Sequence, residues 1–145
     1  MSMSKIPVDE EGELFISGLT TAVEQSTSEF DRVVSVHTRS VEHNVSDEQA
    51  YSWYDIETHT HTYSYRSFER AADEVCSALE AGERILLHDG GEGMDEAVSV
   101  ALAVVGRLKR FSRVEAMQYV HYYRIPDSYP SVSFLRLADR YLRKA

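Results

Sequence analysis

Hydrophobic positions in the second half of the chain follow a helix, strand, helix order. From Ser67 onward, apolar residues recur every three or four positions, which is the spacing of one buried helix face. They are Phe68, Ala71, Ala72, Val75, Cys76 and Leu79. The apolar run 84–88 is typical of a strand inside a parallel sheet. After three glycines within 89–94, a helix rich in Ala and Val is expected from Asp95 to about Lys109, and the whole predicts one α/β unit.

Shorter patterns predict the remaining elements. Two apolar runs, residues 14–16 and 32–37, indicate strands. In the segment 51–65 polar and aromatic residues alternate, so its first part is expected to be a strand and the rest an exposed loop. A helical turn is expected over 26–30 and polar loops over 38–50 and around Pro126 and Pro130. Ser112 with Glu115 forms a capping-box pattern that opens another helix, and 134–142 predicts a last amphipathic helix.

Length and composition indicate one domain with a substantial core. The chain has 145 residues, 43% of them hydrophobic, which is enough to bury a core without covalent staples. Residues 1–12 are polar and acidic and are expected to form a flexible N-terminal arm, which leaves 13–145 as the single domain. Cys76 has no partner for an intrachain disulfide. No leader and no apolar run of about 18 residues is visible, so we expect a cytoplasmic protein without a membrane partner.

The charge balance narrows the possible partners. The net charge is −9, and the fifteen basic residues comprise three lysines and twelve arginines. An acidic excess with few lysines is typical of proteins from a salt-rich cytoplasm, which favours a halophilic source. An acidic mesophilic protein with an arginine bias is the alternative. In either case the surface repels phosphate backbones, and a nucleic-acid partner is not expected because such binding needs a basic face.

The glycine-rich turn is the candidate site. A turn that joins a strand to a helix N-terminus presents converging backbone N–H groups, and the helix dipole favours an anion there. The candidate residues are His88, Asp89, Gly90, Gly91, Glu92, Gly93, Met94 and Asp95. Many α/β proteins contain such a turn for packing alone, so this pattern leaves both a binding site and a structural turn open.

The neighbouring residues carry a family resemblance. The segment 68–73, the strand 84–88 and the helix after the turn resemble the dual-specificity protein phosphatases of the protein tyrosine phosphatase superfamily. The likeness continues upstream over 14–18 and 33–36, and downstream from Glu115 to Leu142. It therefore covers nearly the whole chain from Leu14. It implies an α/β fold with a mostly parallel sheet of about four to five strands flanked by helices, and with a glycine-rich loop between a central strand and a helix.

The signature of that family is degenerate in this chain. By resemblance, the nucleophilic cysteine falls on Asp89 and the phosphate-binding arginine on Asp95. The hydroxyl residue after that arginine falls on Glu96, and a loop glycine falls on Glu92. Only His88 survives among the signature side chains. The family's reaction needs a thiolate and a planar guanidinium, so we expect no phosphatase turnover.

The family's general acid falls near Thr58 by resemblance, where Asp55 and Glu57 would fit only after a register shift. His59 and His61 would share one face if this segment were a strand. Together with Asp55 or Glu57 they would then form a candidate zinc site. An exposed polar loop is the alternative interpretation of the same residues, and no metal or other cofactor is expected.

The substitutions predict a binding role. Two unit charges about 4 Å apart repel by about 4 kcal/mol at an effective dielectric of about 20, so an acidic turn should exclude phosphate. Asp89 is expected to accept N–H bonds of the turn in its place, and the former phosphate pocket to dock a cationic or neutral protein segment. Two alternatives remain. One is metal-assisted hydrolysis, with Asp89, Glu92 and Asp95 around a hard cation, and the other is a phosphatase with a displaced active site.

Overall fold

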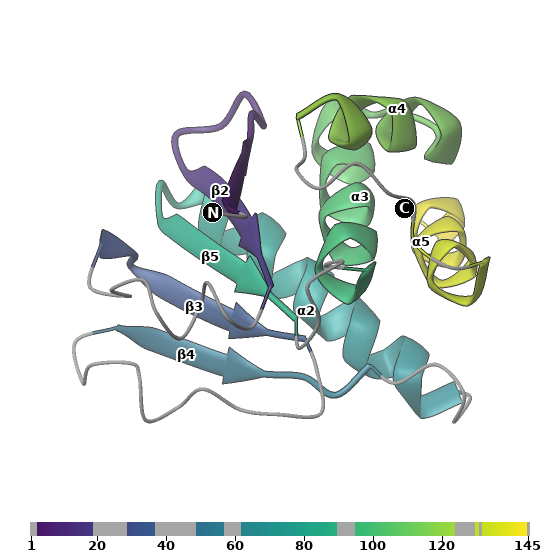
Figure 1. Ribbon diagram of the computed structural model, residues 1–145, viewed down its shortest axis with the longest axis horizontal. Coiled ribbons are helices and arrows are strands. Elements are labelled where there is room, and N and C mark those ends of the chain that lie inside the picture. The colour runs from purple at the N-terminus through teal and green to yellow at the C-terminus, as the bar shows by residue number, and fades with distance from the viewer. Residues whose placement is uncertain are drawn as a thin grey trace.

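A five-stranded sheet forms the centre of the molecule, with the strand order β1-β2-β5-β3-β4 (Figure 1). The computed structural model describes residues 3–18, 29–36, 49–56, 62–89, 95–123, 130 and 132–144. The strands are β1 (Met3–Ile6), β2 (Glu13–Ser17), β3 (Arg32–Ser35), β4 (Ala50–Trp53) and β5 (Arg84–His88). All pairings are parallel except that of β1 with β2. The predicted α/β class with a mostly parallel sheet is confirmed.

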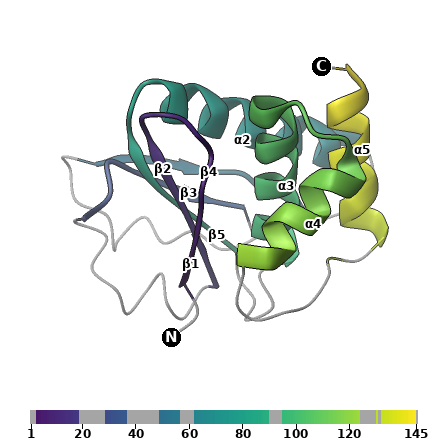
Figure 2. The ribbon, with the colours of Figure 1, turned by 90° about the horizontal axis from the view of Figure 1, so that it is seen from above.

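The helices of the described chain lie on one side of the sheet (Figure 2). They are α2 (Thr62–Glu80), α3 (Asp95–Lys109), α4 (Arg113–Tyr123) and α5 (Val132–Lys144). The bounds predicted for α3 are confirmed. The start predicted for α2 is wrong, because the helix begins at Thr62 rather than Ser67. Tyr65 is therefore a buried helical residue stacked near Phe68 and not part of an exposed loop. None of the described helices combines the length and apolar composition that crossing a bilayer requires.

Strand β5 is buried on both faces, as its continuous apolar sequence predicts. Ile85 and Leu87 belong to the large core between the sheet and the helices. Leu86 points to the other face, where it packs with Phe30 and Val33 in a smaller cluster. Side chains alternate in this way along each strand, so His88 lies on the same face as Leu86, and Asp89 follows on the helical side.

Residues 3–6 correct the prediction of a flexible arm over 1–12. They form the edge strand β1, with Met3 opposite Ser17 and Ile6 opposite Leu14. The side chain of Ile6 is fully buried in the large core. Ile6 is the only fully buried apolar side chain of β1, which gives little periodic signal, so the strand owes its place to pairing with β2. The Lys5 ammonium pairs with Glu13, and such a charge on an edge strand discourages further strand pairing.

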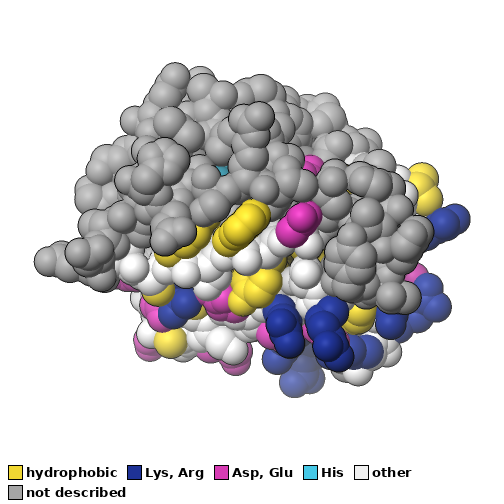
Figure 3. All heavy atoms as spheres, turned by 90° about the horizontal axis from the view of Figure 1, so that it is seen from below, with side chains coloured by type: hydrophobic (Ala, Val, Ile, Leu, Met, Phe, Trp, Pro, Cys, Tyr) yellow, Lys and Arg dark blue, Asp and Glu magenta, His cyan; other side chains and the backbone are white. Residues whose placement is uncertain are grey.

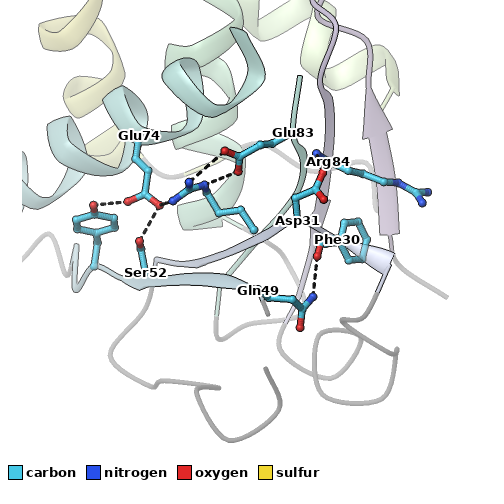
Figure 4. A network of polar contacts seen from close by, with 9 residues as sticks. Phe30, Asp31, Gln49, Ser52, Glu74, Glu83 and Arg84 are labelled. Atoms are coloured by element: carbon cyan, nitrogen blue, oxygen red, sulfur yellow. Dashed lines mark hydrogen bonds and ion pairs between the residues drawn. The ribbon is translucent and has the colours of Figure 1, made fainter. Parts of the chain in front are cut away.

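A polar network fixes α2 against the sheet (Figure 4). The guanidinium of Arg32 at the start of β3 donates from Nε to Glu83 Oε1 at 2.8 Å and from Nη1 to Glu74 Oε2 at 2.9 Å. The Glu74 carboxylate also accepts hydrogen bonds from Ser52 Oγ at 2.6 Å and from the Tyr54 hydroxyl at 2.5 Å. One carboxylate of α2 thus connects β3 and β4, and Arg32 extends the link to the entry of β5.

Candidate functional site

The carboxyl ends of four strands lie in register at one edge of the sheet. Ser17 of β2 is opposite His88 of β5, His88 is opposite Ser35 of β3, and Ser35 is opposite Trp53 of β4. Beyond this edge the chain leaves β5 and enters α3 at Asp95. In open α/β sheets, ligands bind at the carboxyl ends of the strands. The structure therefore places His88 and Asp89, the first two candidate residues, at the edge where a site is expected.

His88 is buried and takes part in an internal chain of hydrogen bonds. Its Nε2 atom lies 2.6 Å from Ser35 Oγ, and the Tyr51 hydroxyl donates to the same Oγ at 2.8 Å. Its Nδ1 atom lies 3.1 Å from the carbonyl oxygen of Asp89. A carbonyl oxygen only accepts, so we assign the ring hydrogen to Nδ1 and an acceptor role to Nε2. His88 thus holds the backbone at Asp89 and joins three strands.

Asp89 is fully buried at the start of the turn. Its backbone N–H donates to the Ser17 carbonyl at 3.3 Å, which continues the pairing of β2 with β5. Its Oδ2 atom accepts a hydrogen bond of 3.0 Å from the backbone N–H of Ala97. Ala97 belongs to the first turn of α3, where amides have no partner within the helix. A carboxylate there is also stabilised by the helix dipole, so Asp89 provides the negative group that such a terminus attracts.

The contact agrees in part with the bond pattern predicted for Asp89. The Ala97 amide donates to the Asp89 carboxylate, but Ala97 belongs to α3 and not to the glycine segment. Gly90, Gly91, Glu92, Gly93 and Met94 lie outside the described residues, as does the side chain of Asp95. A loop closed through these residues therefore stays a prediction, and so does the position of the family's arginine on Asp95.

The metal candidates are not assembled in the described part of the chain. Glu57, Thr58, His59 and His61 lie outside it, so the general-acid position and the zinc pair stay predictions. Among the residues that the structure describes, no three His, Cys, Asp or Glu side chains are grouped closely enough to hold a metal ion.

Cys76 is a core residue, as its place on the apolar face of α2 predicts. Burial raises the pKa of its thiol to about 12, so the thiol stays protonated near neutral pH. A protonated, enclosed thiol is a poor nucleophile. Cys76 therefore does not replace the nucleophilic cysteine that the family resemblance would place at position 89.

Three site residues were missed from the sequence. Ser35, Tyr51 and Trp53 lie on the same face as His88, and the Trp53 side chain is 50% exposed at the end of β4. The alternation of Tyr51 and Trp53 does show that they share a face. Their distance from His88 depends on the order of the strands, which no local pattern contains.

Comparisons with known proteins identify the fold. No family model matches the chain, and no curated protein matches its sequence. The structure of human DUSP28 is similar with a TM-score of 0.72 and 17% identity, covering 97% of this chain and 94% of that one. A leucine-rich-repeat and phosphatase-domain protein from Entamoeba histolytica gives 0.73 and 15%, covering 97% and 92%.

A third similar structure is described as a human tyrosine phosphatase-like serine/threonine/tyrosine-interacting protein. It gives a TM-score of 0.73 at 15% identity and covers 90% of this chain and 91% of that one. Likeness at such low identity shows the fold alone. The chain has the fold of the dual-specificity phosphatases, as its resemblance to that family predicts.

Proposed function

We propose that this chain is a non-catalytic protein built on the dual-specificity phosphatase fold and that it acts by binding. The observation that carries the proposal is the buried Asp89 carboxylate, which accepts the N–H of Ala97 at the start of α3. By resemblance, position 89 is that of the nucleophilic cysteine. A carboxylate at this place supplies no thiolate, and it occupies an amide that would otherwise face an incoming phosphate.

Electrostatics strengthens this argument. A phosphate that approached to about 4 Å from the Asp89 carboxylate would be repelled by about 4 kcal/mol at an effective dielectric of about 20. That repulsion weakens binding by about a thousandfold. Glu96 adds a second negative charge within the first turn of α3. The site is therefore expected to exclude phosphorylated ligands.

The chemistry of the edge favours a cationic or neutral protein segment as the partner. Trp53 is half exposed and lies two strands away from His88, about 10 Å at the usual strand spacing. Exposed aromatic side chains are enriched where proteins bind one another. Figure 3 looks onto the side of the β4 edge, where hydrophobic and acidic side chains lie together, while Lys and Arg side chains gather toward α2 and α5.

One structural neighbour supports a binding role for this fold. The human protein with a TM-score of 0.73 is described both as phosphatase-like and as an interacting protein. We extend that description to this chain as part of the proposal, because Asp89 and Asp95 stand where catalysis would need a cysteine and an arginine.

An activity assay tests the absence of catalysis. The purified full chain is incubated with para-nitrophenyl phosphate, with and without Mg²⁺, Mn²⁺ or Zn²⁺, beside the variants Asp89→Ala and Asp89→Cys. We expect no turnover in any sample, because Asp89→Cys restores a thiol without the guanidinium that binds the phosphate. Turnover without metal that Asp89→Ala abolishes would overturn the proposal. Turnover only with metal would favour metal-assisted hydrolysis instead.

Trp53 is the only tryptophan of the chain, so its fluorescence reports binding at this edge. The probes are two peptides of sequence Ala-Arg-Tyr-Arg-Ala, one with tyrosine and one with phosphotyrosine. We expect the unphosphorylated peptide to change Trp53 emission in a saturable way and the phosphorylated one to bind at least about tenfold more weakly. Tighter binding of the phosphotyrosine peptide would contradict the charge argument, and no response to either peptide would reject this edge as the docking surface.

A further inference from the structure

A second candidate site lies at the opposite end of α3 from Asp89. A pocket of about 910 Å³ opens where the last turn of α3 meets α2 and α5. Figure 2 shows that these three helices are neighbours. Helix α3 contains 15 residues, so at about 1.5 Å per residue the two ends are about 20 Å apart. This pocket is therefore separate from the turn that carries the proposed function.

The lining of the pocket is basic in a chain of net charge −9. Arg107, Arg110 and Lys144 contribute three cations, and Asp73 contributes one carboxylate. Arg107 Nη1 donates to Asp73 Oδ1 at 2.9 Å and to the Tyr141 hydroxyl at 2.6 Å. That carboxylate is thus already paired within the wall of the pocket.

Lys144 and Arg110, the other two cations of the lining, differ in their partners. Lys144 pairs with Glu69 of α2. The exposed guanidinium of Arg110 makes no hydrogen bond or ion pair to another described residue. An arginine beside a cavity with its donors unused is the group best suited to bind a phosphate or carboxylate, because its planar fork can engage two oxygens at once.

The backbone conformation of Arg110 is a second reason to single out this residue. Its φ angle is +59°, in the left-handed region. The N–H of Phe111 donates to the Gly106 carbonyl at 2.9 Å, so Arg110 occupies the position of a helix end that usually holds glycine. A side chain there is strained. The helix dipole does not explain why an arginine occupies this position, since Arg107 and Lys109 already place cations in the last turn.

Apart from Ser77, the rest of the wall is apolar. Phe111 and Leu142 line the pocket beside Gly106, where a Cβ atom would lie 2.7 Å from Leu142 Cδ2. Ligand pockets of about 300–1,000 Å³ typically combine apolar walls with a few polar anchors. We propose that this pocket binds a small organic anion, in which a phosphate or carboxylate group contacts Arg110 and an apolar body lies against Phe111.

Phenylphosphonate is a suitable probe because it joins a dianion to an aromatic ring and has no ester bond. The full chain labelled with ¹⁵N is titrated and its amide shifts are followed by NMR. We expect saturable shifts at residues 106–111 and 142–144. Arg110→Gln should weaken binding about tenfold or more, since a charge-assisted contact is lost. The matched control Arg136→Gln removes an exposed cation of α5 that does not line the pocket, and it should bind like the unaltered chain.

Arg110→Gly separates binding from stability. It should weaken phenylphosphonate binding as Arg110→Gln does, yet raise the urea midpoint, because glycine relieves the left-handed backbone. Three results would overturn the proposal: no saturable shift, shifts centred on residues 88–97, or equal weakening by Arg110→Gln and Arg136→Gln. The second result would also contradict the proposed exclusion of anions at Asp89, whereas the first and third would leave it intact.

Discussion

The hydroxyl of Ser35 lies 2.6 Å from Nε2 of His88, although the two residues are 53 positions apart in the chain. They are paired in register at the carboxyl ends of β3 and β5. The Tyr51 hydroxyl of β4 completes the contact at 2.8 Å from the same Ser35 oxygen. One serine therefore joins the ends of three strands beside the candidate site.

Replacing Ser35 with alanine should destabilise the protein. Ser35→Ala removes a hydrogen-bond partner from the buried His88 Nε2 and from the partly buried Tyr51 hydroxyl, and losing hydrogen bonds at such a site costs about 1–3 kcal/mol. Tyr51→Phe removes one donor and keeps the bond between Ser35 and His88, so its cost should be smaller, about 1 kcal/mol. Urea unfolding of both variants checks this order. A larger cost for Tyr51→Phe would show that Ser35 is not the centre of the contact.

Gly12 and Gly106 give a matched pair of variants, because backbone atoms crowd the first glycine and a side chain crowds the second. A Cβ atom at Gly12 would lie 2.5 Å from the Glu83 carbonyl oxygen and 2.7 Å from that of Leu79, both backbone atoms. Gly12→Ala must therefore move the chain between α2 and β5, and overpacking of this kind costs about 1–3 kcal/mol. For Gly106→Ala, the nearest atoms all belong to the side chain of Leu142.

Gly106→Ala should therefore be the milder change, because a side chain can rotate and alanine favours the helix over glycine by about 1 kcal/mol. Urea midpoints of the two single variants measure the difference. Adding Leu142→Ala to Gly106→Ala should remove the steric part of the loss, and no such rescue is expected for Gly12→Ala. Equal losses in the two single variants would contradict the distinction between backbone and side-chain contact.

The sequence predicts elements whose burial is visible in their own residues. The bounds of β5 and α3 follow from an unbroken apolar run and a regular helical period, and Ser112 caps α4 as its pattern predicts, through bonds of 2.9 and 3.2 Å with Glu115. Strand β1 was missed because its place depends on pairing with β2. The pattern predicts too late a start for α2, because the alternation of polar and aromatic residues over 51–65 includes Tyr65.

The candidate site was predictable in position but not in detail. The order of strand, glycine turn and helix placed Asp89 beside the first turn of α3. The donor to its carboxylate, Ala97, is eight residues further along the chain, and at that separation no local pattern predicts the contact. Ser35 and Tyr51 could not be assigned, because the distance from His88 to either residue is set by strand order.

Alkaline pH should weaken the fold through the buried thiol of Cys76 and the partly buried hydroxyl of Tyr54. Burial raises the pKa of Cys76 from 9.0 to about 12, and burial with a hydrogen bond to Glu74 raises that of Tyr54 from 10.0 to about 12. Both groups lose their protons more readily in the unfolded chain. Their contribution to stability is thus complete below pH 9 and declines as pH rises toward 12. Urea midpoints across this range should fall.

Cys76→Ala isolates the contribution of the thiol to the loss of stability at alkaline pH. The variant is expected to be less stable at neutral pH, because a buried group is shortened, but its urea midpoint should decline less between pH 9 and 12. Tyr54→Phe should likewise flatten the upper part of the range. A decline in Cys76→Ala as steep as that of the unaltered chain would show that the thiol is not linked to alkaline unfolding.

Asp89 offers a test of whether its carboxylate stands in for an anion. Asp89→Ala removes the acceptor of the Ala97 amide, and we expect a cost of about 1–3 kcal/mol in urea unfolding. Asp89→Asn keeps a carbonyl oxygen in reach and should cost less. If the carboxylate fills an anion site, its removal should also let inorganic phosphate bind there, and phosphate should then raise the urea midpoint of Asp89→Ala.

Phosphate also stabilises proteins generally because it is excluded from their surfaces, so a matched variant is needed. Asp31→Ala is suitable, because Asp31 Oδ2 also accepts a backbone N–H, that of Arg84 at 2.7 Å, but at the first residue of β5 rather than beyond its carboxyl end. The rise in midpoint with phosphate should be larger for Asp89→Ala than for Asp31→Ala or the unaltered chain. Equal rises in all three would mean that the start of α3 attracts no anion once Asp89 is removed, and that the carboxylate serves only to cap the helix.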